Sequence, residues 1–282
     1  MKKQNKESNQ NKPDLHVVSF SGGKDSTAML LRMLEEKMPV DIILFCDTGL
    51  EFPALYDHID KVEKNIGIPI TRIKADDSFE YMFCKKEINR GNNSPVTANF
   101  GYQKGYGWPG PRQRWCTERL KNTPRQRYLR ELRKEYNVIE NVGIAADEAY
   151  RLERKNNRRE NCRHPLVEWG MTEKDCLQYC YDRGYDWDGL YEYFERVSCW
   201  CCPLQSLEDL RQLYRHFPKL WEQLQKWDKM TWRTFKAGWS VENLQKRFDF
   251  EEEWQNAGNT SLRTKAFYNA LKERIADENC NN

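Results

Sequence analysis

In the first two thirds of the chain, short apolar runs alternate with segments in which apolar residues recur at helical spacing. Short apolar runs at about 16–19, 40–45, 68–73 and 138–144 are typical of buried strands. Several of the segments between them repeat apolar residues at helical spacing. Strands and helices that alternate in this way predict an α/β fold with a doubly wound, mostly parallel sheet.

The remaining segments differ from this pattern. Residues 1–14 are rich in Lys, Asn and Gln, which predicts a disordered tail before an α/β domain over 15–203. Residues 75–111 show little periodicity and many Gly, Asn and Pro, as in a lid or insertion over a ligand. From 204 to 282 aromatic and aliphatic residues recur at helical spacing, which predicts a C-terminal helical region.

Two helix starts are each marked by a residue with a hydroxyl group and an aspartate three positions later. Thr172 and Ser206 are each followed three positions later by an aspartate, Asp175 and Asp209. In this arrangement each side chain accepts a hydrogen bond from the backbone N–H of the other residue. Helices are therefore predicted from about residue 173 and residue 207.

Charge and cysteine content narrow the class of protein. The net charge of +3 is too small to imply nucleic-acid binding by itself. The ten cysteines are unevenly clustered, and we expect reduced thiols in a cytoplasmic protein rather than a disulfide framework. The longest wholly apolar run, about residues 42–46, is far too short to span a membrane, so we expect no membrane partner.

A phosphate-binding loop is predicted directly after the first strand. Residues 21–27, Ser-Gly-Gly-Lys-Asp-Ser-Thr, join that strand to a helix expected to start at about Thr27. Adjacent glycines let the backbone approach an anion, and the start of a helix presents unpaired N–H groups and a positive dipole end. Lys24 adds a positive charge. The alternative is an ordinary Gly-Gly turn.

The six residues from Ser21 to Ser26 resemble the pyrophosphate loop of the N-type ATP pyrophosphatases. Four further segments, at 47–53, 114–121, 143–151 and 165–169, resemble motifs of the phosphoadenosine phosphosulfate (PAPS) reductase-like branch, in the same order. The likeness runs from about Val17 to Pro203 and is closest to the DNA phosphorothioation sulfur-transfer enzymes. Ala145 and Ala149 depart from it, standing where the branch has an arginine and a serine.

The resemblance implies a nucleotide site at the carboxyl ends of the strands. It implies ATP and Mg²⁺ as cofactors, with an acceptor attacking the α-phosphate and pyrophosphate leaving. Lys24, Asp25 and Asp47 would be catalytic, although Asp47 could equally be an ordinary turn residue. The nucleotide-binding residues that the resemblance implies are Ser21, Gly22, Gly23, Lys24, Asp25, Ser26, Thr27, Asp47, Thr48, Gly49, Gly143, Asp147, Glu148 and Arg151.

A cysteine cluster suggests a metal centre. Cys199 and Cys202, followed by a proline, form a turn that can point two thiolates at one ion, and Cys116 is the natural third ligand. The resemblance implies a four-iron, four-sulfur cluster (4Fe-4S). Cys201 or Cys162 could be its fourth ligand, or one iron could stay open. Structural zinc, a redox pair or plain core thiols are the alternatives.

Three functions remain open at this stage. The intact loop favours an ATP-dependent, adenylating sulfurtransferase. A PAPS or APS reductase is the first alternative, although the chain lacks the C-terminal Glu-Cys-Gly-Leu-His motif of those enzymes. The second is a nucleotide-sensing or nucleic-acid-binding module without turnover, which Ala145 and Ala149 keep open.

The partners expected are an adenine nucleotide, a sulfur-donor protein and, as possible acceptor, DNA or tRNA. Lys and Arg far outnumber Glu between residues 112 and 134, and a second basic run covers 151–163. Each could contact phosphates or be a solvated surface.

Overall fold

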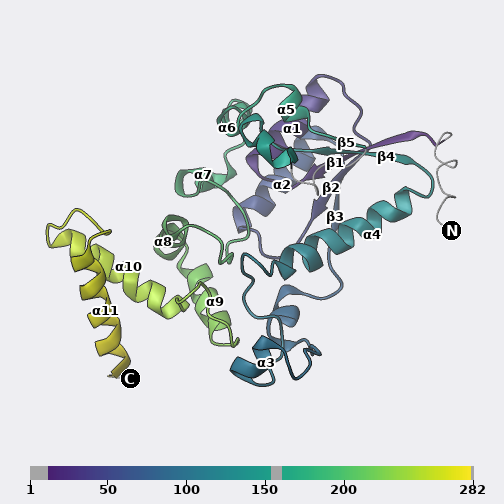
Figure 1. Ribbon diagram of the computed structural model, residues 1–282. Coiled ribbons are helices and arrows are strands. Elements are labelled where there is room, and N and C mark those ends of the chain that lie inside the picture. Colours follow the sequence, from purple (N-terminus) through teal and green to yellow (C-terminus); the bar gives the residue numbers. More distant parts are fainter. Residues whose placement is uncertain (1–11, 154–160, 281–282) are drawn as a thin grey trace. The chain divides into compact units, whose positions relative to one another are not determined.

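The computed structural model describes residues 12–153 and 161–280 (Figure 1). Five parallel strands form one sheet in the order β3-β2-β1-β4-β5. Their bounds are β1 (Asp14–Phe20), β2 (Ile42–Cys46), β3 (Ile70–Ile73), β4 (Asn137–Val142) and β5 (Cys162–Arg163). Helices connect the strands, so the predicted α/β fold with a parallel sheet is confirmed.

Helices cover both faces of this sheet. On one face lies α4 (Thr123–Leu132), whose Leu129 is fully buried against Val17, Leu44 and Val138. On the other side Figure 1 shows α1 (Lys24–Glu35), α5 (Pro165–Glu168) and α6 (Glu173–Tyr181) grouped together. The other elements of this part of the chain are α2 (Pro53–Ile66), η2 (Thr117–Asn122), η3 (Ala146–Glu153), η4 (Trp187–Gly189) and α7 (Leu190–Tyr193).

The strand order creates a crevice beside the central strand. From β1 the chain moves to β2 and β3 on one side, whereas β4 and β5 lie on the other side. The connections that leave β1 and β4 therefore diverge at the carboxyl ends of these neighbouring strands. In open parallel sheets ligands bind at this point.

The chain divides into two compact units. The α/β unit consists of Met1–Phe79 and Trp115–Trp200, and the second unit of Glu80–Arg114 and Cys201–Asn282. The expected insertion at about 75–111 thus falls largely in the second unit. There Trp108 is fully buried and donates a hydrogen bond from Nε1 to Asp228 at 2.8 Å, which ties residues 80–114 to the C-terminal helices.

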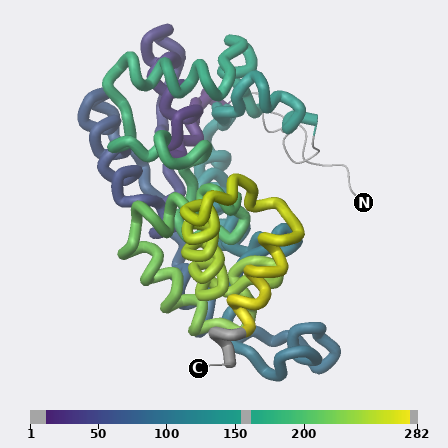
Figure 2. The backbone as a smooth tube through the Cα atoms, turned by 90° about the vertical axis from the view of Figure 1, so that its left-hand side faces the viewer, coloured from purple at the N-terminus to yellow at the C-terminus, as the bar shows by residue number. Residues whose placement is uncertain are grey.

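The second unit is helical. Figure 2 shows its last two helices, α10 (Val241–Asn256) and α11 (Lys265–Cys280), side by side, and the buried ring of Phe267 packs on that of Trp254. A C-terminal helical subdomain was predicted, and it is confirmed. Its other elements are η1 (Tyr81–Lys85), α3 (Pro95–Phe100), α8 (Leu207–His216) and α9 (Pro218–Asp228).

The predicted helix caps are confirmed, whereas two predicted element boundaries differ from the structure. Both predicted capping pairs are present at the starts of α6 and α8. The first helix begins at Lys24 rather than at about Thr27, because Gly23 is its N-cap. Of the predicted N-terminal tail, residues 1–11 lie outside the described residues, and its end is wrong because Asp14 pairs with Asn137 in the sheet. Among the described residues no helix is both long and apolar enough to cross a membrane.

Candidate functional site

The loop after β1 is closed around one hydroxyl. Ser26 Oγ accepts a hydrogen bond from the Ser21 N–H at 3.1 Å and donates one to the Gly23 carbonyl at 3.1 Å. Gly22 has a φ of 78°, and a Cβ there would lie 3.0 Å from the Ile59 side chain. A larger residue would meet both backbone strain and a clash, so this turn requires glycine.

Lys24 is the charged centre of the loop. Its ammonium lies 2.6 Å from Glu173 Oε2, at the start of α6, and 3.3 Å from Asp25 Oδ1. Burial alone would lower the pKa of Lys24, but the carboxylates of Asp25 and Glu173 outweigh it and raise the pKa above its ordinary value. Lys24 therefore carries its positive charge throughout the neutral range.

The end of β4 approaches the first turn of α1 closely. A Cβ at Gly143 would lie 3.2 Å from the Ser26 backbone nitrogen and 3.3 Å from the Asp25 carbonyl oxygen. Glycine at 143 thus allows two neighbouring strand ends to share one crevice. Asp25 lies in the same crevice, and burial raises the pKa of its carboxyl against the opposing effect of Lys24.

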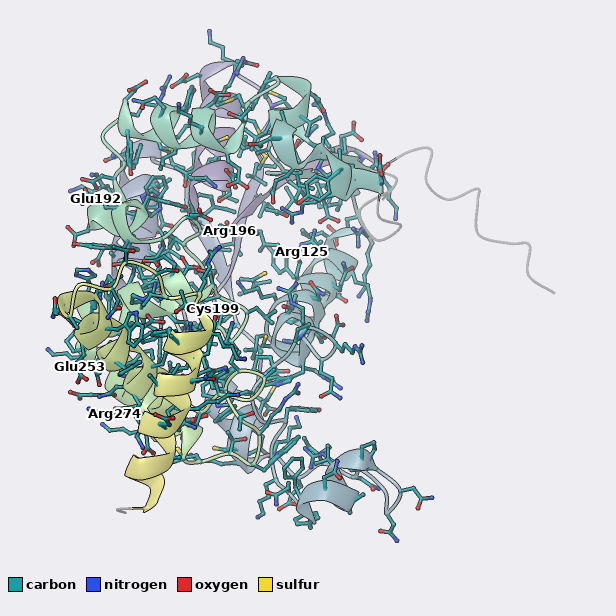
Figure 3. The ribbon with its side chains drawn as sticks, turned by 60° about the vertical axis from the view of Figure 1, so that its left-hand side comes forward. Arg125, Glu192, Arg196, Cys199, Glu253 and Arg274 are labelled. Atoms are coloured by element: carbon teal, nitrogen blue, oxygen red, sulfur yellow. The ribbon has the colours of Figure 1, made fainter. Side chains whose placement is uncertain are left out.

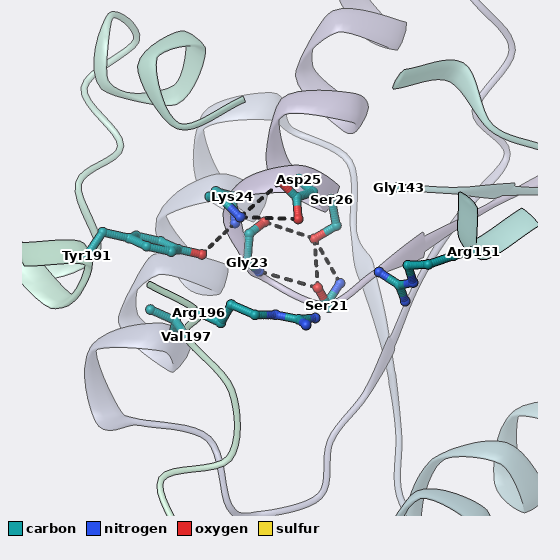
Figure 4. A pocket seen from close by; sticks show the side chains of 10 residues that line it. All are labelled: Ser21, Gly23, Lys24, Asp25, Ser26, Gly143, Arg151, Tyr191, Arg196 and Val197. Atoms are coloured by element: carbon teal, nitrogen blue, oxygen red, sulfur yellow. Dashed lines mark hydrogen bonds and ion pairs between the residues drawn. The ribbon is translucent and has the colours of Figure 1, made fainter. Parts of the chain in front are cut away.

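A pocket of about 200 Å³ opens at this crevice (Figure 4). Its lining of serine hydroxyls, loop backbone and cationic side chains suits phosphate groups. Arg151 lines it and pairs with Glu148, and Arg196 also lines it, exposed and with no ion pair to any described residue. The lining residues are Ser21, Gly23, Lys24, Asp25, Ser26, Gly143, Arg151, Tyr191, Arg196 and Val197.

Three of these lining residues, Tyr191, Arg196 and Val197, were not predicted from the sequence, and neither was Glu173, the partner of Lys24. All four are distant from the loop along the chain. The cap at Thr172 placed Glu173 at a helix start, but no pattern in the sequence connects that helix with Lys24. For Tyr191 and Arg196 the sequence offered no signal.

Other predicted nucleotide-binding residues lie outside the pocket lining. Thr27 is fully buried, and its hydroxyl is 3.0 Å from His58 Nε2. Asp147 accepts a hydrogen bond from the Glu173 N–H at 3.1 Å, and Glu148 pairs with Arg151. These residues thus support groups at the pocket, while Gly22 shapes the loop. Their roles toward a nucleotide stay predictions.

The segment after β2 forms a separate hydrogen-bonded turn. Asp47 accepts hydrogen bonds at Oδ1 from the Gly49 N–H and the Tyr56 hydroxyl, at 2.9 and 2.7 Å, and its Oδ2 lies 2.9 Å from Lys74 Nζ. Thr48 Oγ1 is 3.9 Å from Cys199 Sγ. Asp47, Thr48 and Gly49 are not among the pocket-lining residues, and their roles toward a nucleotide stay predictions.

The predicted cluster cysteines are distributed over both units. Cys116 and Cys199 belong to the α/β unit, and Cys201 and Cys202 to the second unit. Within residues 12–153 and 161–280 no three His, Cys, Asp or Glu side chains are grouped in a way that could hold a metal ion. The metal centre on these cysteines therefore stays a prediction.

Residues 15–205 match the phosphoadenosine phosphosulfate reductase domain family, which is well over half of the chain. The chain belongs to this family. The match covers the sheet apart from Asp14, the loop at 21–26 and the segment after α7 that carries Arg196.

The individual relatives of this PAPS reductase-family chain share about a third or less of its residues in the matched segments. It is 28% identical over 227 residues to an uncharacterized protein of Methanocaldococcus jannaschii, covering 75% of this chain and 40% of the relative. It is 35% identical over 152 residues to an uncharacterized nin region protein of Escherichia phage lambda, covering 50% of this chain and 51% of that one. The chain thus spans about half or less of the length of these curated relatives.

A shorter match and two solved structures are also similar. A phosphoadenosine 5'-phosphosulfate reductase of Alteromonas mediterranea is 36% identical over 66 residues, 23% of this chain and 26% of the reductase. A PAPS reductase structure from Candida auris, a phosphate complex, gives a TM-score of 0.43 at 18% identity over 65% of this chain and 78% of that one. A U34-tRNA thiolase of Methanococcus maripaludis with its [4Fe-4S] cluster gives 0.36 at 15% identity over 80% and 75%.

Proposed function

We propose that this chain is an enzyme that binds ATP at the loop of residues 21–26 and adenylates an acceptor for sulfur transfer. The observation that carries the proposal is the intact Ser-Gly-Gly-Lys-Asp-Ser loop, which lines a pocket at the crevice of the family's sheet. An oxygen of the acceptor would attack the α-phosphate and displace pyrophosphate. A sulfur nucleophile would then attack the carbon that bears this oxygen, with AMP as the leaving group.

The charges around the pocket suit a polyphosphate. Lys24, Arg151 and Arg196 line it, against one lining carboxylate, Asp25. The N-terminus of α1, a helix of 12 residues, starts at the same place and adds its positive dipole end. Asp25 is well placed to help hold a Mg²⁺ ion that accompanies the phosphates, since carboxylate oxygens are ligands that this ion prefers.

The substitution Lys24→Ala tests the binding step. We expect the dissociation constant for inorganic pyrophosphate, measured by titration calorimetry, to rise roughly 10- to 100-fold, because a hydrogen bond to a charged group contributes ~1.5–3 kcal/mol. Lys61→Ala is the matched control: Lys61 bonds to the Gly184 carbonyl and does not line the pocket. Equal affinities for wild type and Lys24→Ala would contradict the proposal.

Product analysis separates this function from a reductase. The named relative in Alteromonas mediterranea makes PAPS reduction the second candidate. An adenylating enzyme releases pyrophosphate from ATP in the presence of its acceptor. A reductase instead releases sulfite from PAPS with a thiol donor. A chain that binds ATP but yields neither product would be a sensing or nucleic-acid-binding module.

Acceptor and sulfur donor are proposed by chemical class. The basic stretch at 112–134 suggests a nucleic-acid acceptor, DNA or tRNA, and a separate sulfur-donor protein would supply the sulfur. Binding to nucleic acid through this stretch should weaken steeply with salt. Binding that does not depend on salt would exclude that acceptor class.

An iron–sulfur cluster stays a separate prediction. Cys116, Cys199 and Cys202 would hold it, with Cys201 or Cys162 as the fourth ligand. Iron and sulfide analysis of anaerobically purified protein, beside Cys199→Ala and Cys202→Ala, tests it. Iron and sulfide lost in both variants would support the cluster, and stoichiometric zinc would instead make the thiols structural.

A further inference from the structure

Two aromatic side chains hold the loop from the segment that follows α6. Trp187 Nε1 donates a hydrogen bond to the Gly22 carbonyl at 2.6 Å, and the Lys24 backbone N–H donates one to the Tyr191 hydroxyl at 2.8 Å. The two rings contact each other edge to face, with centroids 4.8 Å apart. One backbone acceptor and one backbone donor of the loop are therefore fixed by a single segment of chain.

The backbone of that segment is strained. Trp187 and Asp188 have φ values of 53° and 52°, in the left-handed region that residues other than glycine rarely adopt. Such conformations persist where the surrounding contacts determine them, and they are common at ligand sites. Here the strained turn directs the indole at Gly22 and places Tyr191 beside the start of α1.

A buried layer supports Trp187 from behind. Its side chain is 1% exposed and stacks on the ring of His58, with centroids 4.3 Å apart. His58 Nε2 in turn lies 3.0 Å from the Thr27 hydroxyl of α1. Burial lowers the pKa of His58 to about 3, so the ring is neutral and this layer carries no charge at neutral pH. The position of Tyr191 is thus set by packing rather than by a mobile charge.

The Tyr191 hydroxyl has one hydrogen left to donate. A phenol carries one O–H donor and can accept as well, and here it accepts from Lys24. No described residue accepts a hydrogen bond from it, and Tyr191 lines the pocket. Figure 4 shows the hydroxyl directed at the start of α1, while Arg151 reaches toward the loop from the opposite side. Burial raises the pKa of Tyr191 above its ordinary value, so the hydroxyl keeps its proton.

We propose that Tyr191 is a phosphate-binding residue, whose hydroxyl accepts from the Lys24 N–H and donates to a phosphate oxygen in the pocket. The inference rests on the proposed function, in which this pocket holds the phosphates of a nucleotide. A chain of hydrogen bonds that runs from N–H to O–H to a phosphate oxygen strengthens each member and extends the positive end of α1 toward the ligand. Tyr191 thereby contributes a donor that the loop sequence does not contain.

The test uses the full chain and inorganic pyrophosphate as the probe, with affinity measured by titration calorimetry. In Tyr191→Phe we expect about tenfold weaker binding, the loss typical of one hydrogen bond to a charged group. Tyr179→Phe is the matched control, because the Tyr179 hydroxyl donates to Glu35 outside the pocket, and it should bind as wild type does. Tyr191→Phe that binds as tightly as wild type, or more tightly, would overturn the inference.

A second substitution separates donation to phosphate from mere support of the loop. Genetically incorporated 3-fluorotyrosine at position 191 keeps the ring size but makes the hydroxyl a stronger donor and a weaker acceptor. Affinity for pyrophosphate should therefore equal or exceed that of wild type. Weaker binding would show that the hydroxyl acts only as an acceptor for Lys24, and would overturn the inference.

The two proposals fail in different ways. If wild type binds pyrophosphate and Lys24→Ala does not, but Tyr191→Phe matches wild type, the inference alone is wrong. If wild type itself binds no pyrophosphate and no ATP, the proposed function is overturned and the role of Tyr191 with it.

Discussion

The two units each bury a cluster of charged side chains, but the clusters are built differently. In the helical unit Glu251 is 1% exposed and accepts hydrogen bonds from Arg211 at 2.8 Å and Arg247 at 2.7 Å. The Arg247 guanidinium also lies 5.2 Å from the ring centroid of Trp239. In the α/β unit Lys24 pairs with Glu173, yet the same lysine borders an open pocket.

The contrast shows what distinguishes a candidate site from a structural ion pair. Each cluster contains a buried charged side chain, Lys24 or Glu251, that is paired with opposite charges, so neither burial nor pairing identifies function. The difference lies in the hydrogen-bonding groups that face the pocket. Around Lys24 the Tyr191 hydroxyl and Arg196 have donors that no described residue accepts, whereas both oxygens of the Glu251 carboxylate are bonded to arginines.

The largest loss of stability is expected from a substitution of Glu251 in the helical unit. Glu251→Gln leaves the buried Arg247 without its counter-charge and removes one carboxylate partner of Arg211, which also pairs with Glu208. Breaking such a buried pair costs ~3–5 kcal/mol. We expect the free energy of unfolding, from urea denaturation followed by circular dichroism, to fall by about this amount. The affinity of the folded protein for pyrophosphate should not change, since Glu251 does not line the pocket.

An exposed ion pair between α10 and α11 provides the control. Glu253, labelled with Arg274 in Figure 3, lies 3.3 Å from that arginine, and both side chains are about half exposed. Pairs of this kind contribute ~0–1 kcal/mol, so Glu253→Gln should leave stability nearly unchanged. If Glu251→Gln cost no more than Glu253→Gln, the Glu251 cluster would not be the closed structural network described above.

The second-largest effect is expected from His58, which stacks on Trp187 in the α/β unit. The pKa of His58 falls from 6.5 to about 3 on folding, chiefly through burial. Below pH 6.5 the unfolded chain takes up a proton that the folded chain refuses, so stability is present above this pH and is lost as the pH falls. When the pH falls from 7 to 5, the shifted pKa of His58 should lower the free energy of unfolding by about 2 kcal/mol.

Comparison with His58→Gln isolates this contribution from that of the carboxyl groups. The free energy of unfolding is measured at pH 7 and pH 5 for both proteins, and the variant should lose about 2 kcal/mol less than wild type over this interval. Identical losses in the two proteins would mean that His58 is protonated at pH 5 in the folded chain as it is in the unfolded chain. The inference of a neutral layer behind Trp187 would then be wrong.

Local sequence rules predicted the parts of the site that are built from neighbouring residues. The loop at 21–26 and the helix caps at Thr172 and Ser206 are encoded within a few positions, so a strand, a Gly-Gly turn and a capped helix could be recognised. The carboxyl ends of the strands were also indicated as the place of a ligand site, because ligands bind there in parallel sheets.

The residues that complete the pocket could not be predicted in this way. Glu173 and Tyr191 meet Lys24 across 149 and 167 positions of sequence, and these contacts depend on tertiary packing alone. Tyr191 follows Trp187 at helical spacing, a pattern typical of a hydrophobic core. The left-handed backbone at Trp187, which gives the indole its direction, uses a residue type that no turn rule selects.

The smallest effect concerns Arg196, an exposed cation that follows Tyr191 on the same segment. Because solvent screens an exposed charge, Arg196→Gln should weaken pyrophosphate binding only about 2- to 5-fold at low salt, the equivalent of ~0.5–1 kcal/mol. The Debye length shrinks from ~30 Å at 0.01 M salt to ~3 Å at 1 M, so the difference from wild type should decrease as salt is added.

Arg163→Gln removes the same formal charge from the α/β unit, but Arg163 pairs with Glu168 and does not line the pocket. It should have no effect beyond that of net charge. Equal losses in the two variants would mean that the pocket senses only the overall charge of the unit. A loss confined to Arg196→Gln would instead assign this arginine to the ligand, and would extend the contrast with the closed cluster of the helical unit to the exposed edge of the pocket.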